Sequence, residues 1–313
     1  MNRKHEKYER LLAMCKSLPA ARTAVAHPCD ESSLRGAVEA ADMGILDPIL
    51  VGPRARIEAV ARQHSLDIGR FEVVDTPHSH ASAEAAVRLA SQGRAEMLMK
   101  GSLHTDELMA AAVHKEAGLR TARRISHCFV MDVPAIDRPL IITDAAINIF
   151  PTLEDKADII LNAIDLAKAL GLKEPRVAIL SAMETVNPKV PSTLEAAALC
   201  KMADRGQIVG AILDGPLALD NAISPEAARI KQIASPVAGQ ADILVAPDLE
   251  AGNMLAKSLS FMAQADAAGI VLGARVPIIL TSRADSVMTR LASCAVAGLV
   301  AQARREAAAR LAA

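Results

Sequence analysis

An arginine stands near the end of the chain, where an apolar strand is expected to give way to a helix. The segment VPIILTSRADS (276–286) turns from apolar residues to Ser282, Arg283 and Asp285, and an Ala/Leu/Val-rich stretch follows. A guanidinium is always charged, and burying it unpaired is very costly. Beside a helix N-terminus, Arg283 could grip an anion, Ser282 could donate to an oxygen, and Asp285 could accept a proton or hold the guanidinium. Alternatively, Asp285 or Ser286 only caps the helix, and Arg283 pairs with an acid nearby.

Polar residues also follow other expected strands. Short apolar runs with β-branched residues alternate with longer Ala/Leu-rich stretches at helical spacing, which predicts an α/β fold with wound, mostly parallel sheets. Ligands of such sheets lie beyond the carboxyl ends of the strands, next to helix N-termini. Each polar residue there can also be explained as turn chemistry or a helix cap. The residues expected at these ends are Lys100, Gly101, Ser102, Thr143, Asp144, Asp214, Gly215, Pro247, Asp248, Ser282 and Arg283.

The length of 313 residues suggests about two domains. Two prolines interrupt the strand–helix rhythm in VPAIDRP (133–139), and we expect a domain boundary there. The predicted domains are residues 1–136 and 137–284, with the helix of residues 285–313 returning to the first domain and the active-site cleft between the two domains.

Composition argues against several classes of partner. The chain has no Trp, one Tyr and four Phe, and its 35 Lys and Arg nearly balance its 36 Asp and Glu, so a nucleic acid partner is not expected. Its five cysteines are scattered without a CxxC pair, and its histidines lack metal-ligand spacing, so we expect neither disulfides nor a metal site. No run approaches the roughly 20 apolar residues of a membrane span, and no signal peptide is recognised, which predicts a cytoplasmic protein.

Common nucleotide and hydrolase motifs are missing. No GxGxxG follows an expected strand, and neither HExxH nor GxSxG occurs. GAILDGPL (210–217) has the glycine spacing of a P-loop but carries Pro216 and Leu217 where that loop needs Lys and Ser or Thr. A P-loop phosphate site is therefore not expected.

Several long segments, in order, resemble the phosphate acyltransferase family, which comprises phosphotransacetylase and phosphotransbutyrylase. The resemblance covers nearly the whole chain from residue 20 onwards. It is carried by DGPLALDNAIS (214–224), SPVAGQADILVAPDLEAGN (235–253) and TSRADS (281–286), and is extended by residues 99–121, 137–160 and 184–208.

The resemblance implies a two-domain fold like that of isocitrate and isopropylmalate dehydrogenases, and a homodimer. It also implies reversible transfer of an acyl group between coenzyme A and phosphate, with coenzyme A or acyl-CoA as substrate, no permanently bound cofactor and no metal. Ser282 would then stabilise the oxyanion, Arg283 would hold the leaving phosphate, and Asp285 would be the nearest carboxylate base. The predicted substrate-binding residues are Lys100, Gly101, Ser102, Arg120, Asp144, Asp248 and Asn253.

Two positions depart from the acetyl-type pattern, and both departures look more like the butyryl branch. Acetyl-type members carry an acid some six residues after the serine, where this chain has Met288 and Thr289. They also carry an arginine in the helix after the glycine–serine turn, where this chain has Met109. Lys100, Arg120 or Arg124 could supply that missing charge.

Two other functions remain as alternatives. A catalytically silent domain of the same fold could bind acyl-CoA as a regulator, although the presence of both Ser282 and Arg283 argues against it. A hydroxyacid dehydrogenase of the related fold would need clustered acids for a divalent metal, and Asp144, Asp214 and Asp248 are widely separated along the chain.

Overall fold

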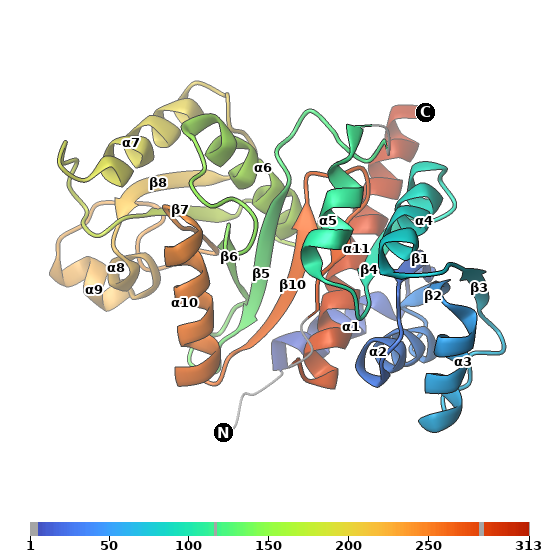
Figure 1. Ribbon diagram of the computed structural model, residues 1–313. Coiled ribbons are helices and arrows are strands. Elements are labelled where there is room, and N and C mark those ends of the chain that lie inside the picture. The colour runs from blue at the N-terminus through green and yellow to red at the C-terminus, as the bar shows by residue number, and fades with distance from the viewer. Residues whose placement is uncertain (1–5, 116–117, 282–284, 313) are drawn as a thin grey trace. The chain divides into compact units, whose positions relative to one another are not determined.

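A computed structural model describes residues 6–115, 118–281 and 285–312 (Figure 1). The chain forms two compact units. We call residues 8–123 with 268–313 the terminal unit, and residues 1–7 with 124–267 the central unit. Both units combine helices with mostly parallel strands, which confirms the predicted mixed α/β class.

The strands of the terminal unit follow one another in the order β3-β2-β1-β4-β11-β10. Neighbouring strands are parallel except for β11 and β10, which pair antiparallel. Two elements cross the limits of this unit: the first two residues of β10 and the first two residues of α1 belong to the central unit, and the rest of both elements belongs to the terminal unit. Its strands are β1 (Ala21–Ala26), β2 (Leu46–Gly52), β3 (Glu72–Asp75), β4 (Met97–Lys100), β10 (Asp266–Leu272) and β11 (Ile278–Ile279). Its helices are α1 (Glu6–Cys15), α2 (Glu31–Asp42), α3 (Arg54–Gln63), α4 (Ser79–Ser91), α5 (Thr105–Val113) and α11 (Val287–Ala312).

The strands of the central unit follow one another in the order β5-β6-β9-β7-β8, and among these described strands only β5 and β6 pair antiparallel. Its strands are β5 (Ser126–Asp132), β6 (Leu140–Thr143), β7 (Arg176–Leu180), β8 (Ile212–Leu217) and β9 (Ile243–Val245). Its helices are α6 (Leu153–Ala169), α7 (Pro191–Asp204), α8 (Leu219–Ile223), α9 (Pro225–Ile230) and α10 (Leu249–Met262).

The proline-containing segment 133–139 connects β5 to β6 as a hairpin. Cys128 pairs with Thr143 and Met131 with Leu140, and both strands lie within the central unit. The chain passes between the compact units at residues 123 and 124, and residues 268–284 belong with the terminal unit. The domain limits predicted above, 1–136 and 137–284, therefore differ from the limits of these compact units and stay a prediction about domains.

Local sequence accounts for the start of several helices. Thr152 caps α6 by accepting from the backbone of Asp155, whose carboxylate accepts in return from the backbone of Thr152. Asp30 caps α2 and Asp248 caps α10 in the same manner, each accepting a backbone N–H three residues on. These caps begin the helices that follow β1, β6 and β9 in the chain.

Candidate active site

The turn after β4 is packed against the end of β1. The backbone N–H of Ser102 donates to the carbonyl of His27 at 2.9 Å, and its hydroxyl donates to the same carbonyl at 2.8 Å. A side chain on Gly101 would place its Cβ 2.3 Å from the carbonyl oxygen of Ala26, so only glycine fits here. Lys100 is 8 % exposed and its ammonium donates to the carbonyl of Gly101 at 3.2 Å.

A pocket of about 500 Å³ opens beside this turn. It draws residues from the carboxyl ends of β1 and β4 and from the first turns of the helices that follow β2, β3 and β4. β2 and β3 lie on one side of β1 and β4 on the other, so the strand order reverses between β1 and β4. This is the topological switch point at which open α/β sheets bind ligands. The lining residues are His27, Cys29, Asp30, Arg56, Ser79, Ser102, Leu103, His104 and Glu107.

Several charged groups shape this pocket. Arg56, an exposed residue, is the only Lys or Arg among the described residues that line the pocket, and none of the described residues accepts a hydrogen bond from its guanidinium or forms an ion pair with it. The Glu107 side chain is 15 % exposed, and its Oε2 is buried without a hydrogen-bond partner among the described residues. Burial lowers the pKa of His27, and the positive charge of Arg56 lowers it further. His27 also adopts a left-handed backbone, with φ of 57°, which is uncommon outside glycine.

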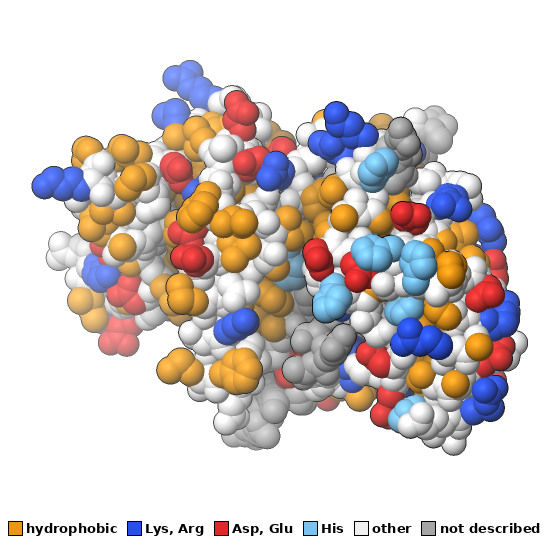
Figure 2. Space-filling model, viewed as in Figure 1, with side chains coloured by type: hydrophobic (Ala, Val, Ile, Leu, Met, Phe, Trp, Pro, Cys, Tyr) orange, Lys and Arg blue, Asp and Glu red, His pale blue; other side chains and the backbone are white. Residues whose placement is uncertain are grey.

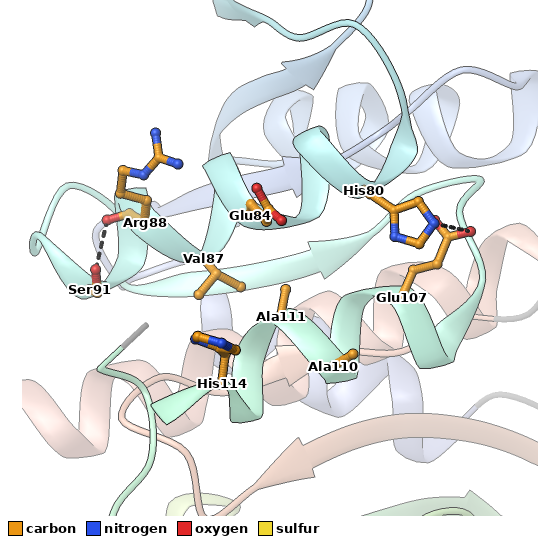
Figure 3. Close-up of a pocket in the computed structure, with 9 residues that line it drawn as sticks. All are labelled: His80, Glu84, Val87, Arg88, Ser91, Glu107, Ala110, Ala111 and His114. Atoms are coloured by element: carbon orange, nitrogen blue, oxygen red, sulfur yellow. Dashed lines mark hydrogen bonds and ion pairs between the residues drawn. The ribbon is translucent and has the colours of Figure 1, made fainter. Parts of the chain in front are cut away.

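A second pocket, of about 510 Å³, lies between α4 and α5 and shares Glu107 with the first pocket (Figure 3). Val87, Ala110 and Ala111 give it an apolar floor, and His80 approaches Glu107 at 4.0 Å from its rim. Figure 2 shows histidine side chains gathered on the same face of the terminal unit. The two pockets together hold His27, His80, His104 and His114.

The segment that opened the sequence analysis begins beside β4. Ile278 pairs with Leu98 and Ile279 with Met99, in parallel register. Ser282 and Arg283 lie outside the described residues, so their predicted roles carry no structural description. Asp285 is half-buried. Ser286 precedes α11 and its hydroxyl accepts from the backbone of Thr289 at 3.1 Å, as a cap does.

Sequence reasoning missed Arg290, in the first turn of α11. Its side chain is 8 % exposed, and Nη1 donates to the Ser32 hydroxyl at the start of α2, at 2.5 Å. A Cβ at Gly36 would lie 3.3 Å from Cδ of Arg290, so this glycine within α2 leaves space for the arginine to cross the helix. A buried arginine anchors the helix that follows the predicted catalytic segment. The segment TSRADSVMTR (281–290) has no periodic pattern from which the burial of Arg290 could be predicted.

In the central unit, the predicted site residue Asp144 organises the turn after β6. Asp144 is 3 % exposed, and its carboxylate accepts from the backbone N–H groups of Ala146, Ile147 and Asn148 at 2.9, 3.0 and 3.2 Å. The side-chain amide of Asn148 donates to it as well, at 2.5 Å. Four donors therefore converge on one carboxylate, which compensates its burial.

The predicted residues Asp248 and Asn253 lie in and next to α10. Asp248 caps the helix through the backbone N–H of Ala251 at 2.8 Å, and the amide of Asn253 donates to the carbonyl of Ala145 at 3.0 Å. A Cβ on Gly252 would lie 2.4 Å from the carbonyl oxygen of Asp144. Thus α10 meets the turn after β6 backbone to backbone, and the structure brings Asp144, Asp248 and Asn253 together.

The two remaining candidate cations differ in their surroundings. Arg124 donates from Nε to Asn148 at 2.7 Å, lies 3.6 Å from Asp155, and its backbone donates to Asp158. Arg120 has an exposed side chain and forms an isolated antiparallel bridge with Ala274 in the terminal unit. Arg124 is therefore held within the central unit.

One buried histidine of the central unit has no predicted role. His127 is 2 % exposed, its Nδ1 has no partner among the described residues, and its ring lies edge-on to Phe129 with centroids 4.3 Å apart. Burial lowers the pKa of His127 to about 4, although the charge of Asp144 opposes this shift. The imidazole is therefore neutral at pH 7.

The described residues offer neither a metal site nor, at Cys29, a reactive thiolate. Among these residues, no three His, Cys, Asp or Glu side chains are placed to hold a metal ion. Burial raises the pKa of Cys29, in the first pocket, to about 11, so its thiol is protonated at neutral pH. Across the described part of the chain, no helix has the length and apolar character needed to cross a membrane.

Comparison with known proteins identifies the family. The model of the family described as "Phosphate acetyl/butaryl transferase" matches residues 80–298. A phosphate acetyltransferase of Rhizobium meliloti is 68 % identical over 301 residues, covering 96 % of this chain and 95 % of that protein. A phosphate butyryltransferase of Clostridium acetobutylicum is 43 % identical, covering 94 % of this chain and 98 % of that protein.

A solved structure agrees with this assignment. The branched-chain phosphotransacylase of Enterococcus faecalis superposes with a TM-score of 0.79 at 32 % identity, covering 90 % of this chain and 99 % of that one. Relatives named for acetyl, butyryl and branched-chain substrates all match, so these names do not fix the acyl chain. The resemblance seen in the sequence is thereby confirmed, and this chain belongs to the phosphate acetyl/butyryl transferase family of acyltransferases.

Proposed function

We propose that this acyltransferase moves a short acyl group reversibly between coenzyme A and inorganic phosphate. The observation that carries the proposal is the match of the family along most of the chain, together with full-length relatives named for this chemistry. In one direction, the thiol of coenzyme A attacks the carbonyl carbon of an acyl phosphate. The C–S bond forms, the C–O bond to phosphate breaks, and the thiol proton passes to a base.

We assign three roles to the segment before α11. Arg283 binds the departing phosphate, because a guanidinium can donate two parallel hydrogen bonds to a phosphate. Ser282 donates to the carbonyl oxygen as it becomes an oxyanion. Asp285 is the proposed base, since Met288 and Thr289 replace the acid expected one turn later. The parallel register of β11 with β4, in which Ile278 pairs with Leu98 and Ile279 with Met99 shortly before this segment, supports the proposal.

The other predicted substrate contacts fall into two groups. Ser102 lines the first pocket and directly follows Lys100 and Gly101 in the chain, which supports a substrate-facing role for this turn. Asp144, Asp248 and Asn253 bond to backbone groups around the turn after β6, and a substrate contact from any of them remains a prediction. The same holds for Arg120.

Several broader features belong to the proposal and rest on the family resemblance. These are a two-domain fold like that of isocitrate and isopropylmalate dehydrogenases, an active-site cleft between the domains, and a homodimer. We also propose that the enzyme acts in the cytoplasm and has no permanently bound cofactor.

The direct test follows free thiol as the purified chain is mixed with acetyl-, propionyl- or butyryl-CoA and inorganic phosphate. We expect thiol release that depends on phosphate, and the rate series across the three substrates measures the acyl preference. A parallel sample without phosphate controls for hydrolysis. Binding of acyl-CoA with no phosphate-dependent thiol release from any of the three would contradict transfer and favour a regulatory domain.

A further inference from the structure

His27 connects the carboxyl ends of four parallel strands of the terminal unit. It directly follows β1, and its backbone N–H donates to the carbonyl of Val51 in β2 at 2.7 Å. Its carbonyl accepts from the backbone N–H of Ser102, which follows β4, at 2.9 Å. Its ring nitrogen Nδ1 lies 3.0 Å from the hydroxyl of Ser82 in α4, the helix that follows β3. One residue therefore links all four strand ends.

The hydrogen bonds of Ser82 fix the direction of its bond to the imidazole. Ser82 is fully buried, and its hydroxyl donates its single proton to the carbonyl of His78 at 2.9 Å. The Ser82 hydroxyl is then an acceptor for its two other neighbours, Nδ1 of His27 at 3.0 Å and the Thr76 hydroxyl at 2.8 Å. Nδ1 of His27 therefore carries a hydrogen, and the Ser82 hydroxyl holds the ring in one orientation.

The bond to Ser82 holds His27 in a backbone conformation that a histidine rarely adopts. The φ of His27 is 57°, in the left-handed region, and such a conformation persists only where the surrounding contacts enforce it. In this conformation the His27 carbonyl accepts from the N–H and the hydroxyl of Ser102, at 2.9 and 2.8 Å, and from the N–H of Cys29 at 2.8 Å. The ring contact to Ser82 thus helps to set the carbonyl that holds Ser102.

We propose that Ser82 is a positioning residue for substrate binding, which acts through His27 to hold Ser102 in place. The inference rests on the proposed function, in which Ser102 contacts a substrate. Ser102 lines the first pocket, whereas Ser82 is fully buried and is not among the described residues that line it. The Ser82 hydroxyl therefore influences a ligand only through the residues that it holds.

Steady-state kinetics of thiol release test this role. The first pocket, of about 500 Å³, is larger than a phosphate ion requires, so we expect the affected substrate to be acyl-CoA. Ser82→Ala should raise the KM for acyl-CoA about fivefold, the effect of one hydrogen bond, while the KM for phosphate and kcat stay unchanged. Ser91→Ala is the matched control, since it also removes a hydroxyl that donates to a carbonyl of α4, and it should behave like wild type.

A double-mutant cycle with Ser102→Ala separates positioning from a general loss of stability. If Ser82 acts through Ser102, the double variant should have the KM of Ser102→Ala alone, because the hydroxyl that Ser82 positions is already absent. A KM raised by the product of the two single effects would show independent sites and would overturn the proposal. Thr76→Val removes the next hydroxyl of the same chain of bonds. It should raise the KM for acyl-CoA by a smaller factor, and it replaces Ser82→Ala if that variant does not fold.

Amide hydrogen exchange tests the positioning without turnover. The N–H groups of Gly101 and Ser102 donate to the carbonyls of Ala26 and His27 at 2.8 and 2.9 Å. A peptide that spans residues 99–103 should exchange about fivefold faster in Ser82→Ala than in wild type or Ser91→Ala. Unchanged exchange, or an unchanged KM in an enzyme that turns over, would overturn the role of Ser82 and leave acyl transfer standing. Failure of the proposed function is distinguishable, because wild type itself would then release no thiol, and the exchange would still decide whether Ser82 holds this turn.

Discussion

The two units use the polar residues at the carboxyl ends of their strands in different ways. In the central unit, Asp144 and Asp248 direct their carboxylates at backbone N–H groups, and Asn253 donates to a backbone carbonyl. In the terminal unit, Arg56 and an oxygen of Glu107 lack a partner among the described residues and line a pocket. Both units carry the same kinds of residue after strands, so residue type alone does not separate a structural carboxylate from a binding group. The hydrogen-bond partners do.

The largest effect we expect in this comparison is at Asp144. Asp144→Ala removes the acceptor of three backbone N–H groups and the Asn148 amide, and the loss of buried partners should cost about 3 kcal/mol of unfolding free energy. Asp144→Asn keeps one side-chain oxygen and should recover part of the loss. Urea unfolding of both variants measures this. A stability equal to wild type in Asp144→Ala would show that the edge of the central unit is not held as described.

The second prediction concerns the neutral histidine of the central unit. Because the pKa of His127 is lowered to about 4 in the folded chain, the unfolded chain binds the proton first as pH falls. The stability that His127 contributes is present above its unfolded pKa of about 6.5 and is lost as pH falls from there towards 4. Between pH 7 and pH 5, wild type should lose about 2 kcal/mol more unfolding free energy than His127→Gln.

Unfolding in urea at the two pH values provides this difference. His114→Gln, an exposed histidine of the terminal unit, serves as the control and should behave like wild type. Identical pH dependence of wild type and His127→Gln would contradict the neutral buried imidazole.

The smallest effect is expected at the cap of α10. Asp248→Ala removes an N-cap and should cost about 1 kcal/mol, whereas Asp248→Asn, which can cap equally well, should cost a few tenths. Thermal unfolding of the pair checks the cap. Turnover of the Asn variant then sharpens the comparison, since a loss of activity without a loss of stability would reveal a substrate contact in addition to the cap.

The sequence predicted those features that depend on neighbours along the chain. The Thr152–Asp155 capping box was read from its spacing, and the alternation of apolar runs gave the mixed α/β class. The predicted domain boundary in residues 133–139 falls on the connection between β5 and β6, and it stays a prediction because two prolines interrupt a strand pattern at a hairpin and at a boundary alike. The resemblance to a family, carried by long ordered segments, was confirmed by the comparisons.

Long-range contacts explain what the sequence could not predict. Arg290 is buried against α2, where it donates to Ser32 and packs over Gly36, and both residues lie more than 250 positions earlier in the chain. Arg56 lies in a polar helix whose sequence contains no motif. It lines the same pocket as Ser102 because the strand order puts β2 and β4 on either side of β1. Ser282 and Arg283 lie outside the described residues, so their roles remain predictions based on the resemblance.

The central claim is that the guanidinium at position 283 holds the phosphate during acyl transfer. It is tested most directly by the phosphate-dependent thiol release of Arg283→Ala, measured at saturating acyl-CoA and phosphate beside Arg283→Lys and wild type. We predict that Arg283→Ala loses about 100- to 1,000-fold in kcat while its unfolding midpoint stays that of wild type, with Arg283→Lys between the two. Turnover of Arg283→Ala within a few fold of wild type would contradict the claim.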